Sequence, residues 1–294
     1  MAIHETKKLK ATGNPTYITW FDGLADMAEV AAEGIKRQPG AWGEFYSYSF
    51  VGRRFFNIHA AAKATGELWP EGMQIFDKML GELETQDLPK PKSTKRRGVW
   101  SEDTGDEVDV DRLRRGVPYW RTTQREQRAG NPIITLITTP SSPGLMKWQN
   151  ILWRGCATVV LAKILEEAGY RCEIKAMQLA IDSYGNNYDY AAATTLKMAN
   201  DPLDCSTLVN CLSGWCFRTV WFSCYNYHNR ASISYGLPIT GSKAIKAYAE
   251  LCPELAEDGS NYLMVGDHSN TSSYETTLER TKALLTKFIE NHGR

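Results

Sequence analysis

A strand–helix–strand unit in the second half of the chain constrains the fold more than any other feature of the sequence. Residues 131–138 (NPIITLIT) form a run rich in β-branched residues, which is typical of a buried strand. After a proline- and serine-rich stretch, residues from about 145 to 168 predict a long helix that ends at Gly169. Residues 171–181 (RCEIKAMQLAI) predict the next strand. Two strands joined through such a helix indicate a parallel pair, with the helix lying across one face of the sheet.

The rest of the sequence completes this domain and predicts two further regions. The other elements expected in the second half are helices over 203–212, 243–251 and 276–290, and a short buried strand over 262–266. We therefore expect an α/β domain over 131–294, with a mostly parallel, Rossmann-like sheet flanked by helices. Apolar residues at helical spacing over 22–37 and 69–84 predict a helical N-terminal region over 1–86. Residues 87–130 lack apolar periodicity, so we expect a charged, aromatic-bearing arm or loop there.

Composition narrows the class of protein. The chain has 294 residues, of which 43% are hydrophobic and 23% charged, as in ordinary globular proteins. No apolar run approaches the ~20 residues of a membrane helix, and the N-terminus lacks the apolar segment of a signal peptide. We therefore expect a cytoplasmic protein with no membrane partner. The seven cysteines are odd in number and contain no CxxC pair, so we expect reduced, mostly buried thiols.

Sequence motifs for catalysis, metal binding and nucleotide binding are absent. The loop after the first predicted strand of this domain carries Thr139, Ser141 and Ser142 but no aspartate, so we expect a serine cap on the following helix instead of a metal site. Asp267 and His268 are the best candidates for a catalytic pair, but an isolated Asp–His at a strand end is typical of a solvated turn. We expect a protein that is not an enzyme and that holds no cofactor or metal.

Aromatic residues are interspersed among blocks of basic residues in the expected arm. Residues 90–128 contain 11 basic and 7 acidic side chains, although Lys plus Arg equals Asp plus Glu over the whole chain. Single-strand binders combine cations that follow phosphates with rings on which bases stack, at ~1–3 kcal/mol per base. The expected phosphate contacts are Lys92, Lys95, Arg96, Arg97, Arg114, Arg115 and Arg121, with Arg53 and Arg54 as a second basic site; the expected stacking rings are Trp100, Tyr119 and Trp120.

Several segments resemble a domain-of-unknown-function family found in phage and bacterial proteins. These are RGCATVVLAKILEEAGYRCEI (154–174), PLDCSTLVNCLSGWCFRTVWFSCYNY (202–227) and, in the N-terminal half, FDGLADMAEVAAEG. The resemblance implies a von Willebrand A-like α/β core without an intact metal site, and no enzymatic role. In size, aromatic content and lack of enzyme motifs, the chain is also similar to the single-stranded-DNA-binding cofactors of podophages that encode their own RNA polymerase.

The leading hypothesis is therefore a non-enzymatic, phage-type protein of the host cytoplasm that binds single-stranded DNA largely independently of sequence. The resemblance implies a phage RNA polymerase as a partner, recruited to melted promoters, and a homo-oligomer would add avidity. The alternative is a protein-interaction adaptor built on a degenerate von Willebrand A-like domain. The acidic run over 102–111 favours this alternative, because it would repel a DNA strand.

Overall fold

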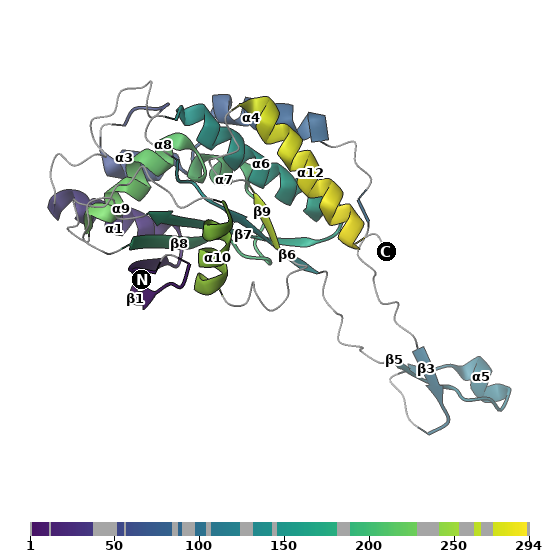
Figure 1. The fold of residues 1–294 in the computed structure, drawn as a ribbon. Helices are drawn as coiled ribbons and strands as arrows, with labels where there is room; N and C mark the ends of the chain where they lie inside the picture. The colour runs from purple at the N-terminus through teal and green to yellow at the C-terminus, as the bar shows by residue number, and fades with distance from the viewer. Residues whose placement is uncertain are drawn as a thin grey trace. The chain divides into compact units, whose positions relative to one another are not determined.

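The chain divides into two compact units in a computed structural model (Figure 1). The larger unit comprises Met1–Pro89 with Ile133–Arg294, and the smaller one is Lys90–Pro132. The structure describes residues 2–11, 13–37, 52–55, 57–83, 88–89, 98–103, 107–123, 132–142, 146–180, 189–227, 241–252, 262–265 and 273–292.

A six-stranded sheet forms the centre of the larger unit, with the strand order β1-β2-β8-β7-β6-β9. Its strands are β1 (Ile3–Lys8), β2 (Pro15–Phe21), β6 (Ile133–Thr138), β7 (Arg171–Ala180), β8 (Asp189–Lys197) and β9 (Tyr262–Val265). The sequence-predicted strand–helix–strand unit is present as β6, α6 (Trp148–Glu167) and β7, and β6 pairs with β7 in parallel. β9 pairs with the other edge of β6, also in parallel.

The expectation of a mostly parallel, von Willebrand A-like sheet with a helical N-terminal region is wrong. β7 pairs with β8 antiparallel, β1 pairs with β2 antiparallel, and β2 joins the sheet parallel to β8. Only residues 181–188 connect β7 to β8, too few for the crossover of a dozen or more residues that a parallel neighbour requires. β8 gave no strand signal because its centre is Ala191–Ala193, and alanine has little preference for strands. The sheet is therefore mixed.

Helices cover one face of this sheet much more fully than the other (Figure 1). The helices of the fuller side are α1 (Leu24–Arg37), α3 (Ile58–Ala64), α4 (Pro70–Leu83), α6, α7 (Cys205–Cys211), α8 (Gly214–Cys216), the π-helix η1 (Phe217–Trp221), α9 (Phe222–Tyr227) and α12 (Tyr274–His292). The opposite face packs against α10 (Gly241–Leu251) through a smaller apolar cluster that includes Tyr248 and Met177. No helix within the described ranges is both long and apolar enough to span a bilayer.

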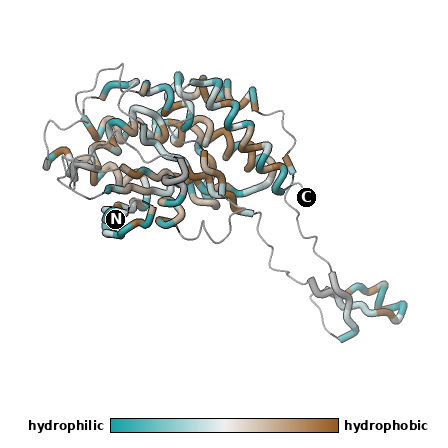
Figure 2. Tube along the Cα trace, in the orientation of Figure 1, coloured by the Kyte–Doolittle hydropathy of each residue, from teal (hydrophilic) through white to brown (hydrophobic). Residues whose placement is uncertain are grey.

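Helix α6 is the centre of the main core. It is buried on nearly all sides, and hydrophobic colouring is concentrated along the middle of the fold in Figure 2. Gly155 permits close packing of α6 against α7, because a Cβ there would lie 2.5 Å from the carbonyl oxygen of Leu212. The aromatic residues Trp215, Phe217 and Trp221 are also fully buried in this core.

The smaller unit has its own three-stranded antiparallel sheet, in the order β3-β5-β4. The strands are β3 (Gly98–Ser101), β4 (Glu107–Val108) and β5 (Trp120–Thr123), and the short helix α5 (Val110–Arg114) connects β4 to β5. The Asp109 carboxylate accepts a hydrogen bond from the Arg112 amide at 3.0 Å, which satisfies a donor at the start of α5. Gly116 follows α5 with a φ of 66°, a left-handed conformation that glycine adopts without strain.

Candidate functional site

Strand register decides how the aromatic residues of the smaller unit are arranged. Arg121 on the central strand β5 is the register partner of Trp100 on β3 and of Glu107 on β4. Trp120 is the partner of Ser101 and Val108. Because neighbouring residues of a strand alternate between faces, the register assigns Trp100 and Trp120 to opposite faces of this sheet. The two tryptophans therefore do not form one continuous stacking platform.

Tyr119 and Trp120 form the aromatic pair of the smaller unit. Their ring centroids lie 6.0 Å apart with the planes tilted by 35°, and both residues are half-buried. The turn that leads into this pair is held by Arg112, whose Nε donates to the carbonyl oxygen of Pro118 at 2.8 Å. Arg114 and Arg115, at the end of α5, are exposed. One short stretch thus presents two guanidinium groups and two rings.

Two residues of the acidic run have defined places in the structure of this unit. Asp109 caps α5, and Glu107 lies across the sheet from Arg121. The unit also exposes four aliphatic side chains, each between 39% and 53% accessible: Val108, Val110, Leu113 and Val117. They are half of the eight large hydrophobic residues that are exposed in the described part of the chain. Within the described residues of this unit, these side chains remain accessible to solvent.

Four of the predicted phosphate contacts, Lys92, Lys95, Arg96 and Arg97, lie outside the described residues, as does the Asp267–His268 pair. For Trp100 and Arg121 the structure describes the backbone position in β3 and β5. These assignments remain predictions.

The second basic site, in the larger unit, contains one packed and one exposed arginine. The Arg53 guanidinium lies 5.1 Å from the ring centroid of Phe55 and 5.5 Å from that of Trp215, and it contacts Glu67 at 3.5 Å. Its side chain is 26% exposed. Arg54 is exposed to solvent. Arg53 therefore has a structural role in an aromatic cluster, and Arg54 is the residue of this pair that an incoming phosphate can reach.

The polar loop after β6 is not a helix cap, contrary to the expectation from sequence. Helix α6 begins at Trp148, with Lys147 as its N-cap and no side-chain hydrogen bond to the cap. Ser141 instead shares a hydrogen bond with Thr139, with their hydroxyl oxygens 2.8 Å apart, and its carbonyl accepts from Arg154 Nη2 at 2.8 Å. These groups are buried, so they hold the loop to α6. Within the described residues, no group of three or more His, Cys, Asp and Glu side chains could hold a metal ion.

The cysteine thiols are held in their neutral form by burial. Six of the seven are buried and Cys205 is half-buried, and all are reduced. Burial raises the pKa of Cys172 and of Cys216 to about 12, and it raises the pKa of Cys205 as well. A thiol needs its thiolate form to act as a nucleophile, so these side chains serve as core residues.

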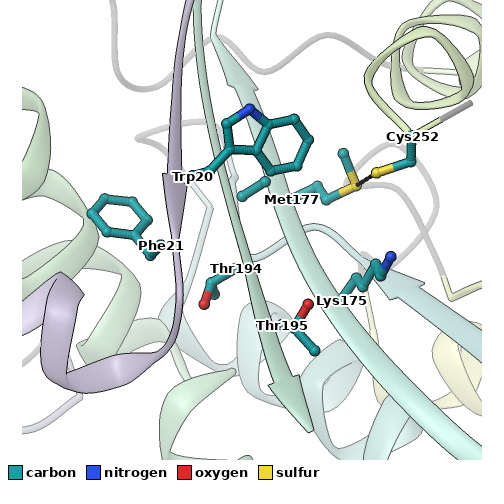
Figure 3. A pocket seen from close by; sticks show the side chains of 8 residues that line it. Trp20, Phe21, Lys175, Met177, Thr194, Thr195 and Cys252 are labelled. Carbon is teal, nitrogen blue, oxygen red and sulfur yellow. Dashed lines mark hydrogen bonds between the residues drawn. The ribbon is translucent and has the colours of Figure 1, made fainter. Parts of the chain in front are cut away.

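A pocket that sequence reasoning missed lies on the α10 side of the larger sheet (Figure 3). It has a volume of about 170 Å³, and the residues around it include Trp20, Lys175, Ala193 and Cys252. They come from β2, β7, β8 and the end of α10, which are far apart in the sequence. Nothing in the local sequence marks them as neighbours, because only the pairing of β2 with β8 and of β8 with β7 brings them together.

Comparison with known proteins adds a family to this description. A family model described as a domain of unknown function (DUF7192) matches residues 4–287, which include the whole of the smaller unit. No curated protein and no solved structure gives a significant match. Since the match covers nearly the entire sequence, the chain belongs to the DUF7192 family.

Proposed function

We propose that the smaller unit binds single-stranded nucleic acid, with the turn from α5 to β5 as the contact surface. The observation that carries this proposal is the combination of exposed Arg114 and Arg115 with the adjacent Tyr119–Trp120 pair. Guanidinium groups bind phosphate, and aromatic rings of this kind stack on unpaired bases. Trp100 occupies the other face of the sheet by register, so it is a weaker candidate for the same strand.

The acidic residues of this unit do not exclude the proposal. Asp109 is engaged as the cap of α5, and Glu107 lies across the sheet from Arg121 and not beside Arg114 or Arg115 in the chain. Arg114 and Arg115 thus lie at the end of α5, whereas Asp109 lies at its beginning.

A second candidate function, self-association, is favoured by the exposed aliphatic residues of the same unit. Leu113 and Val117 flank the two arginines in sequence and are 45% and 39% exposed. Contact between copies of the chain through these side chains would bury them, and it would bring several nucleic-acid surfaces to one strand. Nucleic-acid binding and self-association are compatible, and they depend on different side chains.

Fluorescence anisotropy tests the first proposal. A labelled single strand of about 30 nucleotides and the matching duplex are titrated with the full chain at two salt concentrations. The double variant Arg114→Gln/Arg115→Gln is compared with Arg280→Gln, which removes an exposed arginine from α12. The logarithm of the binding constant changes by about 0.7 per phosphate contact for each decade of salt, so we expect the double variant to reduce this slope by about 1.4. The control should leave the slope unchanged.

The ring contribution is tested by Trp120→Leu against Trp120→Phe. A stacking role predicts weaker binding for leucine and near-native binding for phenylalanine, with circular dichroism verifying that both variants fold. Equal affinity for single strand and duplex, or a salt slope that the arginine variant does not change, would refute the proposal.

Sedimentation equilibrium of the double variant Leu113→Ser/Val117→Ser tests self-association. Self-association through these side chains predicts that the variant is more monomeric than the native protein and has an unchanged salt slope.

A further inference from the structure

The pocket on the α10 face of the larger sheet is formed by a small residue between two large ones. Ala193 on β8 is the register partner of Trp20 on β2 and of Met177 on β7. The three residues form a row across one face of the sheet, and the alanine in the middle leaves a hollow between the indole and the thioether. Figure 3 shows Trp20 and Met177 on the two sides of this hollow.

Neighbouring contacts hold both walls of the hollow in place. The Trp20 indole Nε1 donates a hydrogen bond to the Glu5 carboxylate at 2.7 Å, which fixes the ring on β2. The Met177 sulfur lies 3.9 Å from the Cys252 sulfur at the end of α10, and the Met177 carbonyl accepts from the Tyr248 hydroxyl at 3.3 Å. An indole and a polarizable thioether beside one hollow are a favourable environment for a flat ring, because sulfur and aromatic groups attract one another.

One end of the hollow is polar and contains a lysine side chain. In the next row of the sheet Thr195 is the register partner of Lys175, and both line the pocket. The Lys175 ammonium lies 3.7 Å from Glu173, which also accepts a hydrogen bond from the Thr135 hydroxyl at 3.2 Å. Lys175 and Thr195 therefore place an ammonium group and a hydroxyl group together at this end of the pocket.

We propose that this hollow is a binding site for a small single-ring aromatic anion, with the ring between Trp20 and Met177 and the anionic group at Lys175 and Thr195. The volume of about 170 Å³ suits a single ring, since a cavity of about 150 Å³ accommodates benzene. The site is independent of the nucleic-acid proposal, because every residue of it belongs to the larger unit. The anionic group is a carboxylate or a phosphate, and the two are separated by experiment.

Ligand-observed saturation-transfer NMR on the full chain tests the proposal. The probes are benzoate, phenyl phosphate and neutral benzamide, which has nearly the same shape as benzoate. We expect benzoate or phenyl phosphate to bind at least tenfold more tightly than benzamide. The anion with the lower dissociation constant identifies the class of natural ligand as a carboxylate or a phosphate ester.

Two variants and a control locate the binding site. Lys175→Met should bring the anion down to the affinity of benzamide, and Ala193→Leu should abolish binding of all probes by filling the hollow. Lys163→Met, which removes a partly exposed lysine from α6 on the other face of the sheet, should change nothing. The proposal is overturned if no probe receives saturation, if benzoate, phenyl phosphate and benzamide bind alike, or if Lys175→Met leaves anion binding intact. Lys175→Met keeps the test decisive should Ala193→Leu fail to fold.

Discussion

Asn210→Asp is the substitution for which the structure gives the clearest expectation. Asn210 lies fully buried on α7, and its side-chain Nδ2 faces three carbonyl oxygens at the end of α3: Ala64 at 3.2 Å, Thr65 at 3.0 Å and Glu67 at 2.6 Å. The amide thus donates to the carbonyls of the turn that follows α3, of which the Ala64 carbonyl also accepts from the Glu67 amide at 3.2 Å. Aspartate has the same shape but presents an acceptor where the carbonyls need a donor.

The expected cost follows from this geometry. The two amide hydrogens serve carbonyls that are buried or half-buried, and a buried carbonyl left without a donor costs about 1–3 kcal/mol. The new carboxyl avoids part of the repulsion by staying protonated, which costs about 1.4 kcal/mol for each pH unit between its ordinary pKa and the pH of the experiment. At pH 7, about three units above the ordinary pKa of aspartate, protonation costs about 4 kcal/mol and the one lost donor adds about 1–3 kcal/mol, so we expect a loss of about 5–7 kcal/mol in the free energy of unfolding.

The pH dependence has a definite sign. The pKa of the introduced carboxyl is higher in the folded chain than in the unfolded chain, so the destabilisation is largest at neutral pH. It should shrink as the pH falls from 7 towards 5, because the protonated acid again donates a hydrogen bond. The part of the lost free energy of unfolding that is regained at low pH measures the electrostatic contribution. The part that is not regained measures the misfit of the substituted side chain.

Urea denaturation followed by tryptophan fluorescence measures the effect, with Asn200→Asp as the matched control. The side-chain oxygen of exposed Asn200 accepts a hydrogen bond from Arg171 at 2.8 Å. The same substitution there keeps an acceptor opposite a cation, so the change should lie within about 1 kcal/mol. Equal unfolding midpoints for the two variants, or a loss at position 210 that is independent of pH, would refute the assignment of the amide as a donor to the turn that follows α3.

Two further predictions concern packing and thiol chemistry. Gly155→Ala should destabilise the chain by about 1–3 kcal/mol, because its Cβ would meet the carbonyl of Leu212. Gly81→Ala in α4 should stabilise it by up to about 1 kcal/mol, because an added Cβ there would have no neighbouring atom within 4 Å. Chemical denaturation measures both changes, and shifts of the same sign would contradict the packing of α6 on α7. With a thiol reagent at pH 8, at most one cysteine, Cys205, should react before unfolding and all seven afterwards. Rapid labelling of a second thiol in native protein, located by mass spectrometry, would show that the core opens there.

The unit that the sequence predicted best is β6–α6–β7. Its signals are local: a β-branched run, a long apolar helical stretch that ends at Gly169, and a second strand pattern, each within one element. β9, α10 and α12 were also expected near their observed bounds. Local patterning determines whether a segment is a helix or a strand when its burial has a clear period.

Strand direction and strand order required the tertiary structure. β8 has alanine at its centre, and β1 is exposed along its length, so neither has the alternation that marks a half-buried strand. The antiparallel pairing of β7 with β8 converts the expected parallel sheet into a mixed one. Pairing is a contact between two segments, and the pattern of one segment alone does not encode it.

The candidate sites depend on both the local sequence and the tertiary fold. From the sequence alone came the basic and aromatic character of residues 90–128, because composition is a local property. Only the fold decided that Trp100 and Trp120 occupy opposite faces of the small sheet, since a face is set by register. The hollow between Trp20 and Met177 likewise exists because Ala193 is the register partner of both residues. Residues that far apart in the chain become neighbours only when their strands pair in the sheet.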